Sequence, residues 1–518
     1  MKQEADVVII GAGAAGSFYA ERLAKAGKTV IVLEAGPAWG LEHMVSSQIW
    51  SRRLKWGAAP AVSATPSGSS SQFGWGLGGA ALHHFGTWPR PTADTFKLKS
   101  LYGEDVDWPF DYDQLRPYYD RIQDEMGISG DAAQEPWRPP GAAYPMPPLL
   151  EFRQGQVLKR GFDKLGLPVG PLPAAINSME RKDRPACIYD GWCDAGCPTG
   201  ALANPLVTHL NAAKAAGAEF RTRATVTRIV TDERGRARDV HYLDEKRQPH
   251  SLRASLVVLA GSVIQNPRLL LNSANDKHPD GLANSSGLVG RSLMIESGAQ
   301  VIGLFDEDTE PHMGVSAGQL MRREDHKGNG KRPHGGYQWQ IAPAMKPNDL
   351  FGIAFTKYDL FGARLDAFIR QGVRGMASMM AFGADEPVPE NRILLSSVKD
   401  DLGVPVAEIR HKPSARAHGL WEHMAAEGLA VQRAAGAREA WNSPLAPGHY
   451  AGGTIMGVDP AHSVTDSYGR SHDVSNLILT GAGLFPSNGG VSPTFTIYAV
   501  ALRSVEKILA DWKDYATA

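Results

Sequence analysis

The clearest pattern of apolar and polar positions lies at the start of the chain. Residues 6–10, Asp-Val-Val-Ile-Ile, form a short apolar run rich in β-branched side chains, which predicts a buried parallel strand. Residues 17–26 place apolar side chains at helical spacing, and Gly27 follows where such a helix stops. Residues 29–33 predict a second strand, which ends at Glu34. This order of strand, helix and strand predicts an α/β fold.

The loop between the first strand and the helix has a glycine spacing typical of nucleotide sites. Gly11 allows a tight turn, Gly13 lets the backbone approach a pyrophosphate, and Gly16 lets the helix pack close to the strand. Ala15 lies in the first helical turn, whose free N–H groups attract phosphate. Glu34, eighteen residues after Gly16, is placed to bind ribose hydroxyls. We predict a Rossmann-like dinucleotide-binding domain; a ligand-free tight turn is the alternative, and the motif alone does not separate FAD from NAD.

A second pattern predicts an antiparallel sheet. Residues 335–341 and 392–395 have the composition and spacing of its strands. For the aromatic residues Tyr337, Trp339 and Phe351, we favour a role in the core or on a sheet face over a role in a substrate pocket. The chain has 518 residues, and single cores stop growing near about 250–300 residues, so we expect two domains.

Composition narrows the classes of function. The chain has 54 basic and 55 acidic residues and a net charge of −1, and no basic tail or stripe marks a nucleic-acid partner. There is no run of about 18 apolar residues, so we expect no membrane span. The first strand begins too early for a signal peptide to precede it, so we expect no targeting signal in the chain itself.

Three cysteines, Cys187, Cys193 and Cys197, lie within eleven residues of each other. An odd, clustered set is a poor disulfide framework and a better metal site. Thiolates are soft donors that bind iron, and three of them match a [3Fe–4S] cluster better than a four-cysteine [4Fe–4S] cluster. Two alternatives remain open: a zinc ion with a histidine such as His209 as fourth ligand, and buried thiols without metal.

Several blocks of the sequence resemble the glucose–methanol–choline (GMC) oxidoreductases, in the order of that family. They are residues 76–81 (Gly-Leu-Gly-Gly-Ala-Ala), 256–271, 289–294, 449–457, 476–482 and 493–497. The resemblance implies bound FAD, a Rossmann-like FAD-binding domain beside an antiparallel-sheet substrate domain, and hydride transfer from an alcohol carbon to flavin N5. Residues 111–119 and 283–288 resemble the FAD-dependent bacterial sugar dehydrogenases in particular.

The resemblance also implies roles at the alcohol site. His449 stands at the position of the base that takes the hydroxyl proton, a role that suits histidine. The second site residue of the family is His or Asn, but here Ser492 takes that place. Asn488, four residues earlier, or a water is a candidate substitute for the missing amide. Alternatively, Ser492 caps the last helix.

Further flavin contacts follow from the same resemblance. Gly78 and Gly79 form a second glycine loop, and His83 after it is a candidate for a covalent bond to the flavin, with packing near the ring or phosphate binding as alternatives. Val226 is expected to meet the adenine through its backbone, with an ordinary strand position as the alternative. Ala260 and Gly483 complete the expected contacts.

We therefore expect an FAD-dependent dehydrogenase for a hydroxyl of a sugar, glycoside or polyol. The resemblance implies a [3Fe–4S] cluster, a small partner subunit and a cytochrome acceptor, with a periplasmic location by co-export or else a cytoplasmic one. The alternatives are an oxygen-using oxidase, a dehydrogenase for a non-sugar alcohol, a non-enzymatic redox relay and an NAD-binding regulator. The predicted pieces are 1–90, 185–300 and 435–518 for the FAD-binding domain, including the cysteine segment 187–197, and 91–184 and 301–434 for the substrate-binding domain.

Overall fold

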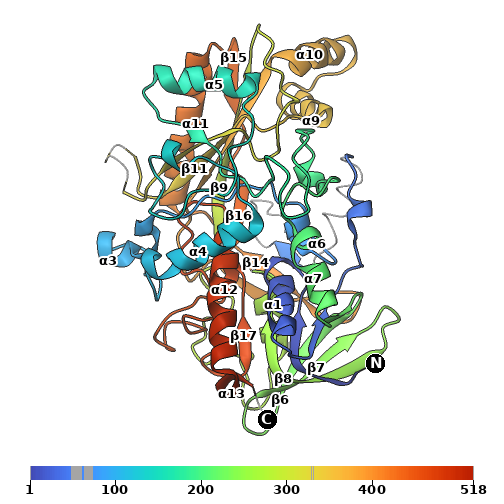
Figure 1. Cartoon of the computed structure of the whole chain (residues 1–518). Helices are drawn as coiled ribbons and strands as arrows, with labels where there is room; N and C mark the ends of the chain where they lie inside the picture. The colour runs from blue at the N-terminus through green and yellow to red at the C-terminus, as the bar shows by residue number, and fades with distance from the viewer. Residues whose placement is uncertain (1, 48–60, 64–73, 328–329, 331, 517–518) are drawn as a thin grey trace.

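The computed structural model describes residues 2–47, 61–63, 74–327, 330 and 332–516. Two large sheets lie at opposite ends of an elongated molecule (Figure 1). The first sheet lies at the end that holds both chain termini, and the second lies at the other end. The functional question is therefore which side chains the two sheets bring together between them.

The first sheet is built around the predicted N-terminal strand. Its strands lie in the order β5 (Glu219–Arg221), β2 (Val30–Leu33), β1 (Glu4–Ile10), β8 (Pro249–Leu259), β7 (Ala237–Leu243) and β6 (Thr225–Thr231). A seventh strand, β17 (Leu477–Leu479), pairs with β8. β1 pairs in parallel with both β2 and β8, which explains why its apolar residues are continuous and not alternating. The α/β prediction for residues 6–33 is confirmed.

Helices cover this sheet. Helix α1 (Ala14–Lys25) begins directly after the first glycine turn and packs against α7 (Leu210–Ala215) and the last long helix, α12 (Thr494–Ala510). Helix α4 (Tyr112–Met126) packs on the other side of α12. Figure 1 shows α1 and α12 side by side, although they come from opposite ends of the sequence. The start of α12 is thereby held next to the glycine turn.

The second sheet is antiparallel and faces the first across the middle of the molecule. Its strands lie in the order β15 (Glu439–Asn442), β9 (Met294–Leu304), β12 (Met376–Gly383), β11 (Tyr337–Ile341), β10 (Leu320–Glu324) and β4 (Gly170–Pro171). A seventh strand, β16 (Ala446–Ala451), also pairs with β9. Helix α11 (Ala415–Ala435) packs against β9 and β12, and α5 (Arg153–Lys164) packs against α11.

The alternation along β11 sends two kinds of side chain to opposite faces. Trp339 and Tyr337 point towards α11, where the Trp339 indole donates to Glu427 (2.6 Å), so the expectation of a core role is met for these two residues. It is wrong for Phe351, which lies on a helix and is 39% exposed. Gln338 and Gln340, which alternate with the two aromatic residues of β11, therefore point towards the other face of the sheet.

A small third sheet and several short helices complete the described fold. The predicted strand at 392–395 forms β13 (Arg392–Lys399), which pairs antiparallel with β14 (Pro405–Arg410), in a sheet separate from β11; β3 (Ala61–Ser63) pairs in parallel with β14. The remaining helices are α3 (Leu98–Tyr102), α6 (Pro205–Thr208), α8 (Gln265–Asn272), α9 (Pro347–Tyr358), α10 (Gly362–Gly375) and α13 (Trp512–Tyr515). Short 3-10 turns are η1 (Leu41–His43), η2 (Gly79–Leu82), η3 (Ala93–Phe96), η4 (Ala132–Gln134), η5 (Cys193–Ala195) and η6 (Ala482–Leu484).

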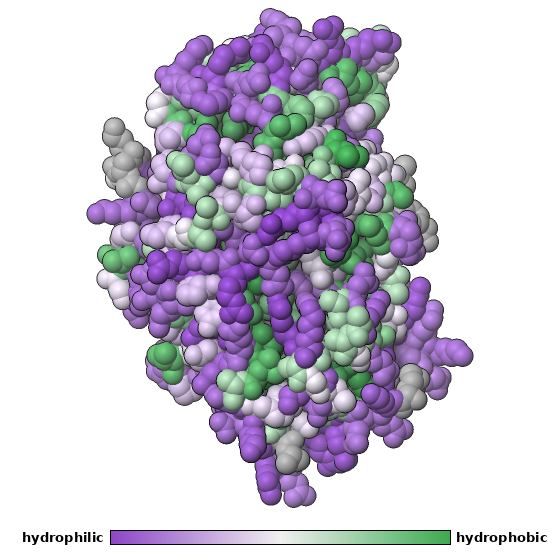
Figure 2. Space-filling model, in the orientation of Figure 1, coloured by the Kyte–Doolittle hydropathy of each residue, from purple (hydrophilic) through white to green (hydrophobic). Residues whose placement is uncertain are grey.

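The boundaries of the two domains stay a prediction, but the pairing of strands bears on them. β15 and β16 lie in the range 435–518, which the sequence assigns to the FAD-binding domain, yet both pair with β9 in the second sheet. Backbone pairing of this kind gives no signal in the local sequence. Among the described residues, no helix is long and apolar enough to cross a membrane. The face shown in Figure 2 is mainly hydrophilic, with hydrophobic side chains in small scattered groups.

Candidate active site

In the first glycine turn, two glycines lie against neighbouring backbone and the third lies beside open space. A Cβ on Gly11, whose φ is +97°, would lie 2.6 Å from the carbonyl oxygen of Ala260, and a Cβ on Gly16 would collide with the carbonyl of Gly11. A Cβ on Gly13 would meet no heavy atom within 4 Å, because this residue borders a cavity. Gly11 and Gly16 thus allow strand and helix to pack, while Gly13 leaves room for a ligand at the N-terminus of α1, the place where pyrophosphate binds such turns.

Glu34 holds this turn to the second glycine loop. Its carboxylate accepts hydrogen bonds from the backbone N–H groups of Ala12 (2.9 Å), Gly36 (2.9 Å) and Gly76 (3.2 Å). Burial raises the pKa of this carboxyl, and the three N–H donors oppose that effect by stabilising the charged form. Glu34 also borders the cavity, so its predicted contact with a ribose hydroxyl remains compatible with its position.

The second glycine loop packs against the first. Gly78, in the left-handed region, donates its N–H to the carbonyl of Ala12 (2.9 Å), and a Cβ on Gly79 would lie 3.0 Å from Gly13 Cα. His83 lines the cavity, and its Nδ1 lies 3.3 Å from the carbonyl oxygen of Asp194. Covalent attachment of His83 to flavin stays a prediction.

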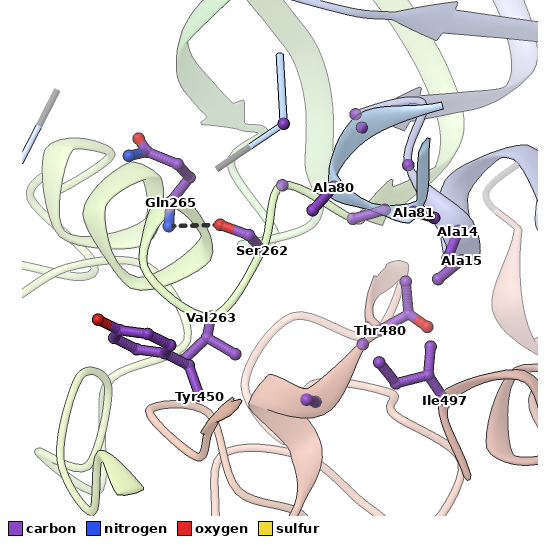
Figure 3. A pocket seen from close by; sticks show the side chains of 18 of the residues that line it. Ala14, Ala15, Ala80, Ala81, Ser262, Val263, Gln265, Tyr450, Thr480 and Ile497 are labelled. Carbon is purple, nitrogen blue, oxygen red and sulfur yellow. Dashed lines mark hydrogen bonds between the residues drawn. The ribbon is translucent and has the colours of Figure 1, made fainter. Parts of the chain in front are cut away.

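The cavity runs from this double loop to the second sheet and has a volume of about 840 Å³. Ala14 and Ala15 of α1 lie near Ala80 and Ala81 of the second loop, and Thr480 and Ile497 face them (Figure 3). Ligand cavities of about 300–1,000 Å³ are usual, so this one has room for a dinucleotide cofactor. Several predicted flavin contacts line its wall: Gly11, Gly13, Ala15, Glu34, Gly79, His83, Val226 and Ala260.

Three predicted flavin contacts lie behind the wall. Gly16 and Gly78 shape the turns described above and are not exposed to the cavity. Gly483 lies within η6, where its carbonyl accepts the N–H of Thr454 (3.1 Å), and its neighbours Gly481 and Ala482 line the cavity in its place. Sequence position alone therefore located the right segment but not the residue on the wall.

At the far end of the cavity, His449 is held by a buried carboxylate. The Nδ1 atom of His449 lies 2.6 Å from Oε2 of Glu296, whose side chain is 1% exposed. Burial raises the pKa of Glu296, and the neighbouring imidazole opposes the shift. The Nε2 atom of His449 has no hydrogen-bond partner among the described residues, and the ring packs 4.9 Å from that of Phe382. The Glu296 carboxylate thus fixes the orientation of the His449 imidazole, whose Nε2 is left to act as a base.

A β-bulge produces this arrangement. β16 pairs with β9 at Pro447↔Ser297 and again at Tyr450↔Ile295, with a register shift between the two pairs. Two residues, Gly448 and His449, therefore oppose the single residue Glu296. Bulges of this type turn a side chain out of the regular strand pattern. The shift accounts for the position of His449, which faces the cavity and the carboxylate at once.

Ser492 and Asn488 have different positions. Ser492 lines the cavity, and its Oγ accepts a hydrogen bond from Nε2 of Gln338 (2.8 Å). The alternative of a helix cap is wrong, because α12 begins after Pro493 and no side chain caps it. Asn488 lies on a separate small cavity behind His449, and its Oδ1 accepts the N–H of Asp385 (3.2 Å). Asn488 is thus not on the wall of the large cavity.

The sequence interpretation missed four residues of this site: Glu296, Gln338, Gln340 and Phe382. Three of them left a signal. Glu296 is the one acidic residue in the apolar strand 294–304, and Gln338 and Gln340 alternate with buried aromatic residues along β11. Polar side chains at inward positions of a strand mark a functional face.

The three cysteines lie in a loop that reaches the wall of the large cavity, where Asp194 of the loop contacts His83. Backbone N–H groups point at two sulfurs, from Tyr189 to Cys187 Sγ and from Leu202 to Cys197 Sγ, each at 3.3 Å. Burial raises the pKa of the Cys187 thiol to about 11 and that of Cys193 well above its ordinary value, so a bound metal ion would have to displace the protons of these two thiols. Asp194, between Cys193 and Cys197, is the residue whose carbonyl lies next to His83.

The spacing of the sulfurs bears on the kind of metal. Among the described residues, which include all three cysteines, the three sulfurs are not grouped within 4.8 Å of one another. A single tetrahedral zinc ion holds thiolates only about 3.8 Å apart, given Zn–S bonds of about 2.3 Å. Nδ1 of His209 pairs with Glu21 at 2.6 Å, and its buried Nε2 has no hydrogen-bond partner among the described residues; the histidine is grouped with Glu21 and Glu125 and not with the cysteines. The zinc site with His209 stays an untested alternative.

Comparison with known proteins agrees with this geometry. The sequence profile of the GMC oxidoreductase family matches residues 5–297 and 387–501. The chain is 31% identical to the fructose dehydrogenase large subunit of Gluconobacter japonicus, over 98% of each chain. It is also 31% identical to a 2-methyl-1,2-propanediol dehydrogenase of Mycolicibacterium austroafricanum, over 99% of this chain and 96% of that one. The solved formate oxidase of Aspergillus oryzae RIB40 shares the fold, with a TM-score of 0.69 and 15% identity over 99% of each chain. The chain belongs to the GMC oxidoreductase family and is an FAD-dependent oxidoreductase that acts on CH–OH donors.

Proposed function

We propose that this chain oxidises a hydroxyl of a sugar, glycoside or polyol to a carbonyl and passes the electrons through an iron–sulfur cluster to an external acceptor. One observation carries the first part: His449, which Glu296 holds from behind, lines the same cavity as the double glycine loop. FAD bound in this cavity supplies the hydride acceptor. The relatives named after fructose and a propanediol support a polyhydroxylated substrate.

The residues at the end of the cavity near the second sheet accept and stabilise the proton of the substrate hydroxyl. Nε2 of His449 accepts the proton of the substrate hydroxyl, and the resulting positive charge is stabilised by Glu296 at 2.6 Å. Phe382 packs on the imidazole and limits the access of water to it. Ser492 and Gln340 border the same space and orient the substrate oxygen.

The donor set of the cysteine loop supports the second part of the proposal. Cys187, Cys193 and Cys197 would hold a [3Fe–4S] cluster, in which each thiolate binds a different iron and the sulfurs lie farther apart than around one ion. Such a cluster accepts electrons one at a time. The backbone N–H groups at Cys187 and Cys197 stabilise thiolate charge, as hydrogen bonds to cluster ligands do.

The partners follow from the same comparison. The Gluconobacter relative is named as a large subunit, which supports a small partner subunit for this chain, and a cytochrome-type protein is the proposed electron acceptor. With such a partner the chain is exported to the periplasm, and without one it stays in the cytoplasm. Purification from the native cell, followed by identification of the bound proteins, tests both statements.

Anaerobic mixing of the purified yellow protein with sugars, glycosides and polyols tests the function. We expect loss of the flavin absorbance near its oxidised maximum with at least one of them, and an iron–sulfur EPR signal in the same sample. In air, the same substrate should reduce an artificial one-electron acceptor without stoichiometric hydrogen peroxide. Stoichiometric peroxide would instead identify an oxidase, and no bleaching with any alcohol would refute the proposal.

A further inference from the structure

The place of the missing family amide is occupied by two glutamines from the second sheet. Gln338 and Gln340 of β11 point to the face of the sheet that borders the cavity, and both are at most 2% exposed. The Nε2 atom of Gln338 lies 2.8 Å from Ser492 Oγ, and the Nε2 atom of Gln340 lies 3.5 Å from the same oxygen. A serine two residues before α12 and two amides from a strand thus form one polar group.

The hydrogen bonds of Ser492 leave its proton free. A hydroxyl group has two lone pairs and one proton. The contacts with Gln338 and Gln340 use the oxygen as an acceptor, so the O–H remains as a donor. Ser492 lines the large cavity, as His449 does. The serine therefore offers the cavity a donor, which is the role that an asparagine amide would have at this position.

Gln340 offers the opposite function next to it. This side chain lines the cavity, and its Oε1 is buried without a hydrogen-bond partner among the described residues. A buried acceptor without a partner is unfavourable, and such an atom at a binding site indicates a donor on the ligand. The cavity wall thus has a donor, Ser492 O–H, beside a side chain with an unpaired acceptor, Gln340 Oε1; the Nε2 atom of the same amide lies 3.5 Å from Ser492 Oγ.

We propose that Ser492 and Gln340 together recognise a vicinal diol. The Ser492 hydroxyl donates to the oxygen that is oxidised, and Gln340 Oε1 accepts the proton of the hydroxyl on the adjacent carbon. The two oxygens of such a diol lie at about hydrogen-bond separation, roughly 2.8 Å, which suits a donor and an acceptor placed side by side. Gln338 is a positioning residue, because its Nε2 donates a hydrogen bond to Ser492 Oγ (2.8 Å) and so fixes the direction of the serine hydroxyl. This inference rests on the proposed function and specifies its substrate.

Other small ligands fit this pair less well. A carboxylate has no proton for Gln340 Oε1, and its charge would lie near the buried carboxylate of Glu296. A simple alcohol satisfies Ser492 but leaves Gln340 Oε1 unpaired. Sites built to bind a substrate hydroxyl discriminate strongly against analogues that lack it, because the buried partner stays without a bond.

A binding experiment separates this recognition from catalysis. The FAD-loaded protein is titrated with 2,3-dimethylbutane-2,3-diol and with 2,3-dimethylbutan-2-ol; neither has a hydrogen on the carbinol carbon, so neither is oxidised. Dissociation constants come from calorimetry or from the flavin spectrum. We expect the diol to bind about tenfold tighter, the value of one net hydrogen bond. Equal dissociation constants for the two ligands would overturn the inference without any variant being made.

Variants then assign the two atoms. Gln340→Leu should bring the ratio of the two dissociation constants close to one, whereas Ser492→Ala should weaken both ligands and leave the ratio unchanged. Gln300→Leu is the matched control, because Gln300 lies on β9 of the same sheet, bonds Ser378 at 3.3 Å and does not line the cavity. An unchanged ratio in Gln340→Leu, or an equal loss in Gln300→Leu, would contradict the assignment.

Kinetics distinguish the failure of this inference from failure of the proposed function. Anaerobic flavin reduction is measured with an oxidisable 1,2-diol and with the corresponding primary alcohol. The inference is supported if kcat/KM is lower for the alcohol than for the diol in the wild type and if this difference disappears in Gln340→Leu. Equal kcat/KM values would refute diol recognition while leaving alcohol oxidation established. Absence of reduction with either compound would refute the proposed function itself.

Discussion

The buried carboxylate opposite His449 should control the rate of flavin reduction. Replacing Glu296 by Gln keeps the shape of the side chain and removes its charge. In the variant, the His449 imidazole would become protonated without the stabilising Glu296 carboxylate, which in the wild type lies 2.6 Å from Nδ1. Hydrogen bonds to charged groups contribute about 1.5–3 kcal/mol, so we expect the reductive rate constant to fall about 10- to 150-fold. The substrate dissociation constant should change little, because Glu296 does not line the large cavity.

Stopped-flow spectroscopy under anaerobic conditions measures both quantities from the dependence of the reductive rate on substrate concentration. Glu427→Gln is the matched control: this carboxylate accepts from Trp339 (2.6 Å) and Tyr337 on the opposite face of the same sheet. It should lower the melting temperature without changing the reductive rate. An unchanged rate in Glu296→Gln, or the same loss in Glu427→Gln, would refute the role of Glu296.

The pH dependence gives a second test of the same residue. Burial raises the pKa of Glu296 above its ordinary value, so its charge is lost as the pH falls through that raised pKa. The reductive rate of the wild type should therefore approach that of Glu296→Gln at low pH, and the difference should grow as the pH rises. A constant ratio across the pH range would contradict this interpretation.

Further predictions concern the cofactors and the stability of the fold. Gly13→Ala should fold with an unchanged melting temperature of the apoprotein but retain little FAD, because the new Cβ enters only the cavity; Gly16→Ala, whose Cβ meets backbone, should lower the melting temperature itself. Absorbance and calorimetry distinguish the two. Cys193→Ser should abolish the iron–sulfur EPR signal and the reduction of external acceptors but leave anaerobic flavin reduction intact; loss of that reduction as well would argue for a purely structural loop. Burial raises the pKa of Glu135 from 4.5 to about 7, so its stabilising effect is complete below about pH 4.5 and is lost as the pH rises through 7. Relative to Glu135→Gln, the free energy of unfolding of the wild type should fall by up to about 3 kcal/mol over that interval, as denaturant titrations at several pH values would show. Parallel curves for the two proteins would contradict this.

The parts of the site that the sequence predicted are those built from contiguous residues. The glycine turn at residues 11–16 specifies its own geometry: Gly11 and Gly16 are required by close backbone contacts, and Gly13 leaves the space that borders the cavity. Alternation predicted the strand at 335–341, since a period of two is a local property. For the same reason, the family block at residues 449–457 located His449, and the close spacing of the three cysteines located the cysteine loop.

The parts that could not be predicted depend on pairing between distant segments. Glu296 and His449 meet only because a bulge shifts the register between β9 and β16, which are 153 residues apart at this contact. Ser492 meets Gln338 across 154 residues. No local pattern encodes such distances. This is also why Asn488, close to Ser492 in sequence, lies on a different cavity.

The central claim is that His449 takes a substrate proton beside a bound flavin. The most direct test is the anaerobic reductive rate of His449→Ala, compared with the wild type at equal FAD content and with the polyol that reduces the wild type fastest. A positioned base contributes about 10²- to 10⁴-fold, so the variant should keep its yellow colour and lose at least about 100-fold in rate. A variant that is reduced as fast as the wild type, or a wild type that binds no FAD, would contradict the account.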